Sequence, residues 1–314
     1  MPTFLGQKKD TLLSGGTVAL GFFDGCHLGH REILETCCRH GGKLAAVFTF
    51  PNHPTTVIPG RAAPALVTSC EERIELLESL NLRVFLKEFD RDFSSWSAER
   101  FVSDILVCKL GVSHVVVGHD YRFGHRAAGD VELLQSLGEK NDFACTVVEA
   151  VMHEGEEPFV ISSTRVRQAV AGGEMLLAHQ LLGQPYFFSS RVSKGLQKGR
   201  TIGFPTANLS FPEGKVSPPH GVFAIRATLS DGTQCLGVAN YGLRPTVQTG
   251  QKEPLFEAHL FDFDGVLYGS QVKIEICAYV RGEKKFGSLD ELRQQILTDE
   301  KKVRAFFSDS DKVG

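Results

Sequence analysis

The first part of the chain alternates short apolar runs with amphipathic stretches. Apolar residues recur at helical spacing between the runs, and Ser69, Ser97 and the pair Gly129-Asp130 stand where helix N-caps are expected. Two further short helices, separated by a glycine pair, are expected at 164–170 and 174–182. The short apolar runs are 17–20, 44–50, 84–86, 115–117 and 146–151. The amphipathic stretches between them are 71–80, 98–110 and 130–137. This alternation predicts a parallel α/β sheet with crossover helices.

The pattern changes after residues 183–185. Segments typical of strands then follow one another, and Asp-Gly pairs between them favour tight hairpins. An amphipathic helix from about 288 to 307 closes the chain. The strand segments are 187–193, 221–229, 234–240, 255–261 and 272–279. We therefore predict an antiparallel barrel or sandwich over 186–314, which follows an α/β domain over 1–183.

Length, net charge and cysteine pattern bear on the number of domains, the partners and the cellular compartment. A chain of 314 residues with 42% hydrophobic content exceeds the usual single core, which agrees with two domains. The net charge of −3 provides no global basic field, so a nucleic-acid partner is disfavoured. No stretch approaches the roughly 20 apolar residues of a membrane helix. The eight cysteines show no Cys-x-x-Cys spacing, as expected of thiols that stay reduced. We therefore expect a cytoplasmic protein, and one without a membrane partner.

One strand-to-helix turn in the first domain carries glycines and two histidines. The strand at 17–20 runs into Gly25, His27, Gly29 and His30 before the next helix. Anions bind at such turns because the N–H groups of the helix N-terminus point toward them. Histidines at this spacing share one face of a first helical turn, and Gly29 lets a phosphate approach the backbone. The spacing alone also suits ligands of a structural metal, or polar surface groups.

The turn resembles the His-x-Gly-His signature of the nucleotidyltransferase superfamily, and the Gly-x-Phe-Asp-Gly before it resembles bacterial FAD synthetases. Segments 50–54, 117–124 and 161–167 follow in the order that this family shows. The resemblance implies a Rossmann-like domain that adenylylates FMN to FAD, with His27 and His30 as catalytic residues. It also implies nucleotide or flavin contacts for Gly25, Gly29, Asn52 and Asp120, and ATP phosphate contacts for Ser163, Thr164 and Arg167.

The implied reaction depends on positioning rather than on a covalent nucleophile. The FMN phosphate attacks the α-phosphorus of ATP and pyrophosphate leaves, so the protein supplies orientation and electrostatic stabilisation. Two imidazoles at the turn would donate hydrogen bonds to the charge that develops on the phosphate. The chain has no Gly-x-x-x-x-Gly-Lys-Ser/Thr motif, and the histidine-bearing turn takes the place of that phosphate cradle.

A glycine-rich, basic stretch at 195–208 carries the candidate chemistry of the second domain. It suits a loop over phosphates with a metal alongside, although a plain glycine-rich hairpin has the same composition. Its Gly-Arg-x-x-Gly-Phe-Pro-Thr-Ala-Asn resembles the riboflavin kinase signature, and 237–246 and 256–263 resemble later segments of that family. The resemblance implies a β-barrel kinase domain. It also implies nucleotide contacts for Gly199, Arg200, Gly203, Thr206 and Asn208.

The kinase resemblance assigns further roles to three residues. Thr206 and Asn208 would hold Mg²⁺ beside the nucleotide phosphates, and Glu257 would be the general base for the riboflavin 5′-hydroxyl. Glu257 begins an otherwise apolar strand, where a carboxylate costs free energy unless it is paired or useful. The alternative for Glu257 is an exposed charge on an edge strand. Asp262 flanks a hairpin turn and is expected to be solvated.

Together these resemblances cover nearly the whole chain and predict a bifunctional enzyme. It would use Mg-ATP twice, first to phosphorylate riboflavin to FMN and then to adenylylate FMN to FAD. Its partners would be these small molecules, and the sequence leaves the oligomeric state open. Two alternatives also stay open: an enzyme with only one working half, and a flavin-binding regulator without turnover.

Overall fold

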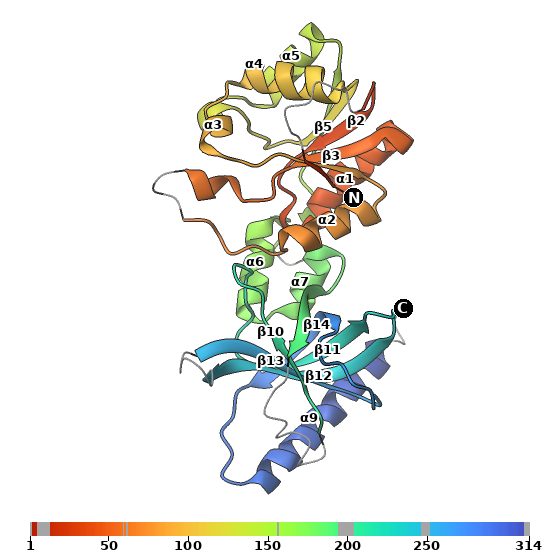
Figure 1. The fold of residues 1–314 in the computed structure, drawn as a ribbon, viewed down its shortest axis with the longest axis vertical. Coiled ribbons are helices and arrows are strands. Elements are labelled where there is room, and N and C mark those ends of the chain that lie inside the picture. Colours follow the sequence, from red (N-terminus) through yellow and green to blue (C-terminus); the bar gives the residue numbers. More distant parts are fainter. Residues whose placement is uncertain are drawn as a thin grey trace. The chain divides into compact units, whose positions relative to one another are not determined.

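The protein divides into two compact units, Met1–Ser163 and Thr164–Gly314 (Figure 1). The structure is a computed structural model that describes residues 2–4, 13–58, 60, 62–155, 157–193, 204–245 and 252–310. Parallel strands form the sheet of the first unit, and antiparallel strands form that of the second. The predicted order of an α/β domain and a β-rich domain is confirmed. Over the described ranges, no helix is both long and apolar enough to cross a membrane.

A six-stranded parallel sheet forms the centre of the first unit, in the order β1-β4-β3-β2-β5-β6. The strands are β1 (Thr3–Phe4), β2 (Thr17–Leu20), β3 (Ala45–Thr49), β4 (Arg83–Leu86), β5 (His114–Gly118) and β6 (Ala144–Val148). From β2 the chain adds β3 and β4 on one side, and then β5 and β6 on the other. The direction of strand addition therefore reverses between β2 and β5, where ligands bind at the carboxyl ends of strands in open α/β sheets.

Helices cover both faces of this sheet. They are α1 (Leu28–Gly41), α2 (Cys70–Ser79), α3 (Arg91–Ser94), α4 (Ala98–Phe101), η4 (Val102–Leu110) and α5 (Val131–Lys140), with short 3-10 turns η1 (Asp24–Cys26), η2 (Gly42–Leu44), η3 (Pro54–Val57) and η5 (His125–Ala127). Val18 and Leu20 of β2 pack with residues of η4 and α5, whereas Ala19 packs with residues of α1 and α2. Alternate residues of a buried strand thus contribute to two separate cores.

All three predicted helix caps are present. Ser69, Ser97 and Asp130 each accept a hydrogen bond from the backbone N–H three residues later. At α2, Glu72 also accepts from the Ser69 N–H, which completes a capping box. The helix that follows Ser97 changes from α to π geometry over Val102–Leu110.

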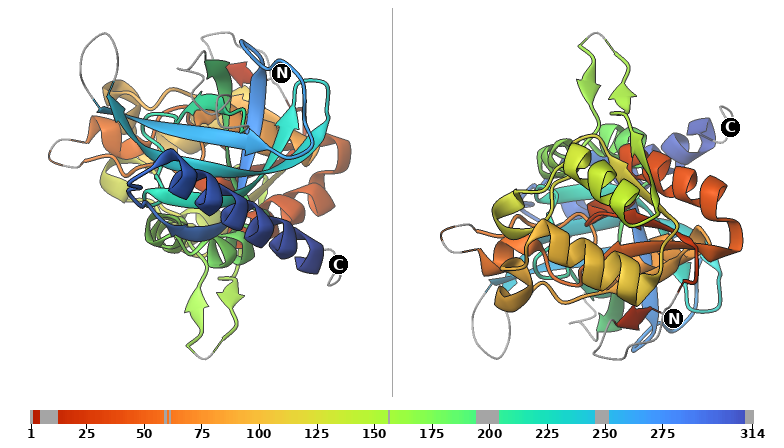
Figure 2. Two further views of the ribbon diagram at one scale, coloured as in Figure 1. Left: turned by 90° about the horizontal axis from the view of Figure 1, so that it is seen from below. Right: turned by 90° about the horizontal axis from the view of Figure 1, so that it is seen from above.

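A short hairpin that the sequence pattern did not predict follows β6. It pairs β7 (Met152–His153) with β8 (Phe159–Val160) and projects from the first unit in both views of Figure 2. Strands of two residues are too short to show a periodicity in the sequence.

The second unit contains a closed antiparallel barrel, which decides between the barrel and the sandwich. The strands are β9 (Tyr186–Ser193), β10 (Ala207–Ser210), β11 (Gly221–Leu229), β12 (Gln234–Pro245), β13 (Lys252–Leu260) and β14 (Gln271–Gly282). Their order is β10-β13-β12-β11-β14-β9, and pairing of β10 with β9 closes the ring.

Aromatic side chains fill the interior of this barrel. Phe256 of β13 contacts Phe188 of β9, Phe223 of β11 and Tyr241 of β12, and two of these strands are not neighbours of β13. Because successive strand residues point to opposite faces, Glu257 lies on the outer face.

Helix α9 (Leu289–Ser310) lies along the outside of the barrel (Figure 2, left) and confirms the predicted closing helix. Its Val303 and Phe307 are buried with valines of β11 and β12. Asp299, which is 2% exposed, forms an ion pair of 2.7 Å with Arg281 of β14. These contacts attach the helix to the barrel wall.

The helices α6 (Ser163–Gly172) and α7 (Met175–Leu182) confirm the two predicted short helices. Helix α7 packs on β9 and β14, and its Ala178, Leu181 and Leu182 are buried. Both helices therefore group with the barrel, whereas the sequence pattern suggested a boundary near residue 183.

We expect a fragment 184–314 to fold and form FMN, but to melt at a lower temperature than a fragment 164–314. Removing α7 exposes apolar surface of the barrel, and each fully buried leucine contributes about 1.5–3 kcal/mol. Thermal unfolding followed by circular dichroism compares the two fragments. Equal melting temperatures would show that α7 does not stabilise the barrel.

Candidate active sites

The turn after β2 has a backbone conformation that a buried carboxylate stabilises. Phe23, Gly25 and Cys26 have φ angles of 58°, 83° and 44°, a region that residues other than glycine rarely adopt. The Asp24 side chain is 3% exposed and accepts from the backbone N–H groups of residues 67 and 68, at 2.9 and 3.1 Å. These hydrogen bonds hold the turn so that α1 starts in a defined direction.

His27 and His30 lie side by side where α1 begins. His27 is the N-cap residue, and its Nδ1 accepts the backbone N–H of His30 at 3.3 Å. The ring centroids are 3.6 Å apart, and the ring planes are 19° from parallel. A Cβ atom at Gly29 would lie 3.2 Å from the His27 ring, so the glycine leaves space for this arrangement.

Burial keeps the His30 ring neutral. The pKa of His30 lies well below its usual value, first because the ring is buried and then because positive charge on His27 and Arg73 opposes its protonation. Its Nδ1 is buried without a hydrogen-bond partner among the residues that the structure describes. A neutral imidazole carries one N–H donor and one acceptor nitrogen. At neutral pH this ring can therefore donate one hydrogen bond to a phosphate.

The histidine pair follows β2, which lies between β3 and β5, and so stands beside the point between β2 and β5 where strand addition reverses. The hydroxyl of Ser163, the first residue of α6, donates to the Asp24 carbonyl at 2.9 Å and so approaches the turn. Asp120 is exposed two residues after the end of β5. The predicted residues that gather around the turn are Gly25, His27, Gly29, His30 and Ser163.

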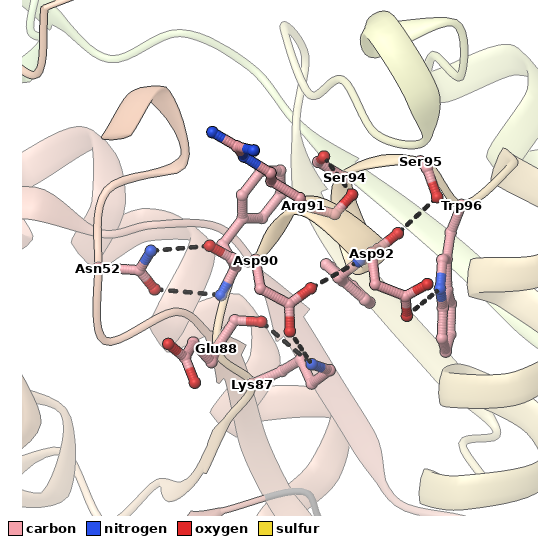
Figure 3. Close-up of polar contacts among 11 residues, drawn as sticks. Asn52, Lys87, Glu88, Asp90, Arg91, Asp92, Ser94, Ser95 and Trp96 are labelled. Atoms are coloured by element: carbon pink, nitrogen blue, oxygen red, sulfur yellow. Dashed lines mark hydrogen bonds and ion pairs between the residues drawn. The ribbon is translucent and has the colours of Figure 1, made fainter. Parts of the chain in front are cut away.

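Asn52 binds the protein backbone through both groups of its side-chain amide. Its Nδ2 donates to the Phe89 carbonyl at 2.8 Å, and its Oδ1 accepts the Phe89 N–H at 3.1 Å (Figure 3). In the same loop Asp90 caps α3 and lies 3.6 Å from the Lys87 Nζ (Figure 3). Asn52 thus orients the loop that follows β4, and its contact with nucleotide or flavin stays a prediction.

Thr164 and Arg167 lie in the first turns of α6. The Arg167 Nη2 donates to the Thr164 hydroxyl at 3.3 Å. Arg165 is exposed, whereas Val166 is buried. A hydroxyl and a guanidinium near a helix N-terminus suit an anion, and the contact of both residues with ATP phosphates stays a prediction.

In the second unit, Asn208 and Glu257 lie opposite each other on neighbouring strands. Asn208 of β10 pairs with Glu257 of β13, which in turn pairs with Asn240 of β12. Directly opposed residues share a face, so these three polar side chains form a row on the outside of the barrel. Asn208 is 5% exposed, and its Oδ1 is buried without a hydrogen-bond partner among the described residues. A carbonyl oxygen in this position suits a hard cation.

Thr206 is half-buried and directly precedes β10. The segment before it is held against β13, because the His259 Nδ1 contacts the Pro205 carbonyl at 2.9 Å. The Phe204 ring packs edge-on against His259, with 5.3 Å between centroids. The predicted nucleotide contacts Gly199, Arg200 and Gly203 lie outside the described residues.

Sequence reasoning missed Asp24, Asn240 and His259, which support the two sites. All three lie in segments that carried the resemblances. The strand register alone would have placed Asn240 beside Glu257, whereas the contacts of Asp24 and His259 join residues distant in the sequence. Only the fold reveals such contacts.

The turn offers no reactive thiol. Burial is the main reason that the pKa of Cys26 rises to about 12, so its thiol stays protonated at neutral pH. The part of the chain that the structure describes also contains no group of three or more His, Cys, Asp or Glu that could hold a metal ion.

Comparison with known proteins adds independent information on both units. A FAD synthetase family model matches residues 9–165, and a riboflavin kinase family model matches residues 182–307. The chain belongs to the bifunctional riboflavin kinase/FMN adenylyltransferase family. Members of that name occur in Haemophilus influenzae (36% identity; 96% of this chain and 97% of the relative covered) and in Escherichia coli K12 (39% identity; 93% of each).

A solved structure is also similar over most of the chain. It is described as a macrolide-efflux protein from Streptococcus pneumoniae, with 30% identity, a TM-score of 0.81 and coverage of 93% of this chain and 94% of that one. The two family models and the relatives' names confirm the predicted enzyme with two activities, riboflavin phosphorylation and FMN adenylylation. Such an enzyme has ATP and flavins as its substrates.

Proposed function

We propose that the first unit adenylylates FMN through the stacked pair His27 and His30. An FMN phosphate oxygen forms a bond to the α-phosphorus of ATP while the bond to pyrophosphate breaks. The neutral His30 donates a hydrogen bond to the negative charge that develops on the transferred phosphate, and His27 assists it. The N-terminus of α1 adds its partial positive charge. The observation that carries this proposal is the 3.6 Å stacking of the rings at that N-terminus.

The remaining predicted residues of the first reaction would bind rather than react. We propose that the glycines of the turn let phosphates approach the backbone, and that residues of α6 bind ATP phosphates. Asn52 and Asp120 would border the nucleotide and the flavin, Asn52 through the loop that it holds. The residues proposed for phosphate binding are Gly25, Gly29, Ser163, Thr164 and Arg167.

We propose that Glu257 is the general base for riboflavin phosphorylation on the outer face of the barrel. Its carboxylate accepts the proton of the riboflavin 5′-hydroxyl while that oxygen attacks the γ-phosphorus of ATP and ADP leaves. Thr206 and Asn208 would hold Mg²⁺, which neutralises phosphate charge when it is bound. The buried Asn208 Oδ1 without a partner supports this site. Gly199, Arg200 and Gly203 stay predicted nucleotide contacts.

Asn208→Leu tests the proposed magnesium ligand. The leucine matches the asparagine in size but lacks the Oδ1, so we expect FMN formation to require roughly tenfold more Mg²⁺, the effect of losing about 1.4 kcal/mol of binding. Initial rates of FMN formation are measured over a Mg²⁺ titration. FAD formation from FMN, which uses the other unit, is the internal control and should keep the wild-type Mg²⁺ dependence. An unchanged Mg²⁺ requirement for FMN formation would contradict the assignment.

We further propose that the enzyme works in the cytoplasm on small molecules, without a nucleic-acid or membrane partner. The net charge of −3 supports this view, because it provides no general attraction to polyanions. The flavin and ATP substrates implied by the family are small molecules.

A further inference from the structure

Arg73 of α2 is a buried cation beneath the turn that carries the histidines. Its side chain is 0% exposed. Its Nη2 donates to the carbonyl oxygens of Phe50 and Pro51, at 2.6 and 3.4 Å, and so contacts the chain directly after β3. Its Cζ lies 4.1 Å from the centroid of the Phe22 ring, in the turn after β2. The guanidinium therefore joins the ends of two adjacent strands.

No carboxylate forms an ion pair with this guanidinium among the described residues, and its Nε and Nη1 are buried without a hydrogen-bond partner. The charges of Asp24 and Glu71 act on Arg73 without such direct contact and oppose the lowering of its pKa. The nearby acidic side chains contact other groups: Asp24 accepts from backbone N–H groups, Glu71 from the Ser69 hydroxyl and Glu72 from the Ser69 N–H. Burial lowers the pKa of Arg73, but an arginine in a protein stays charged at neutral pH.

A buried charge without a counter-ion in direct contact costs free energy of folding, and a hydrophobic side chain of similar size would avoid this cost. Packing alone therefore does not explain an arginine at this position. The substrates of the neighbouring reaction are polyanions, and a cation acts more strongly on them through low-dielectric protein than through water. The Phe23 ring, next to Phe22, packs edge-on against His30 with 5.3 Å between centroids.

We propose that Arg73 is a positioning residue for FMN adenylylation: its buried charge creates a positive potential behind the phosphate-binding turn that carries His27 and His30. Its contacts with Phe22 and Phe50 also fix the strand ends on either side of the site. The inference rests on adenylylation in the first unit. Arg73 itself is buried, so it acts through the turn and not by touching substrate.

The charge should be visible in the pH dependence of adenylylation. The charged or titratable groups that act on His30 are His27 at the N-cap of α1 and Arg73 of α2. Removing the positive charge of Arg73 makes protonation of His30 easier, so the pKa of His30 rises. Because the neutral ring is the active form, the rate then falls at a higher pH on the acidic side of the profile.

The test compares Arg73→Met, which removes the charge, with Arg73→Lys, which keeps it. For each full-length variant, kcat and KM for FAD formation from FMN and ATP are measured across pH, and the His30 ring is titrated by NMR. We expect Arg73→Met to lower kcat/KM about tenfold, as the loss of a residue that supports directly contacting groups typically does. We also expect it to shift the acidic limb of the pH profile and the His30 titration to higher pH. Arg73→Lys should keep both near the wild-type pH, and FMN formation should be unchanged in both variants.

Two outcomes overturn the proposal. In the first, Arg73→Met folds and keeps the wild-type kcat/KM and the wild-type acidic limb of the pH profile. In the second, Arg73→Met and Arg73→Lys lose equal amounts of kcat/KM and the acidic limb does not move, which indicates a purely structural role. If Arg73→Met does not fold, Arg73→Gln takes its place, because its amide can still donate to the Phe50 carbonyl. Failure of both neutral variants to fold, while Arg73→Lys folds, also overturns the proposal. A wild-type protein that forms no FAD contradicts instead the proposed function of the first unit.

Discussion

Glu257→Gln should lower the rate of FMN formation by about two to four orders of magnitude. The substitution keeps the shape of the side chain and removes its basicity, so the 5′-hydroxyl of riboflavin loses its proton acceptor. Glu257 lies between Asn208 and Asn240 across three neighbouring strands, which places a base beside the proposed magnesium ligand. The measurement is the initial rate of FMN formation from riboflavin and ATP with Mg²⁺. FAD formation from added FMN should stay at the wild-type rate.

Asp262→Asn is the matched control for this experiment. Asp262 was expected to be solvated; its side chain is 79% exposed, but it also accepts two hydrogen bonds from Arg304 of α9, at 2.9 and 3.2 Å. An exposed ion pair contributes little, so the control should form FMN at the wild-type rate. Near-normal FMN formation by Glu257→Gln would mean that Thr206, Asn208 and Mg²⁺ support the reaction without this base.

His30→Ala should stop flavin processing at FMN. Loss of one preorganised hydrogen-bond donor to a developing charge typically costs about 10²- to 10³-fold in rate. The substitution also leaves His27 without the ring on which it stacks. With riboflavin and Mg-ATP, the variant should accumulate FMN at the wild-type rate and form FAD only slowly, as chromatography of the flavins would show.

His40→Ala controls for the loss of a histidine from the same helix. His40 is exposed in the last turn of α1, at the opposite end from His30, and its removal should not change FAD formation. If His30→Ala forms FAD from FMN at the wild-type rate, the histidine pair does not stabilise the transferred phosphate.

Local signals predicted most of the fold. The capping residues Ser69, Ser97 and Asp130 marked helix starts correctly, because a cap depends only on residues within one turn. The change of sequence pattern near residue 183 correctly predicted that a new sheet begins there. It did not reveal that α7 packs on the barrel, because the partner strand β14 lies about 90 residues further along the chain.

The sequence predicted the motif residues of the candidate sites, but not the residues that surround them in the fold. The spacing of His27 and His30 predicted a shared helical face, and the rings are indeed stacked. The lowered pKa of His30 comes mainly from burial and then from His27 and Arg73, and no pattern within the motif indicates this burial or the contribution of α2. The ligand contact expected of Asn52 stays a prediction, and the structure adds that its side-chain amide binds the Phe89 backbone. That contact joins residues distant in the sequence.

The most direct test of the central claim is a time course with one purified protein. Riboflavin, ATP and Mg²⁺ are mixed with the full-length chain, and riboflavin, FMN and FAD are separated chromatographically at successive times. A bifunctional enzyme predicts that FMN appears first and that FAD then forms at its expense. FMN that is never converted to FAD, or riboflavin that is bound and stays unchanged, would contradict the account.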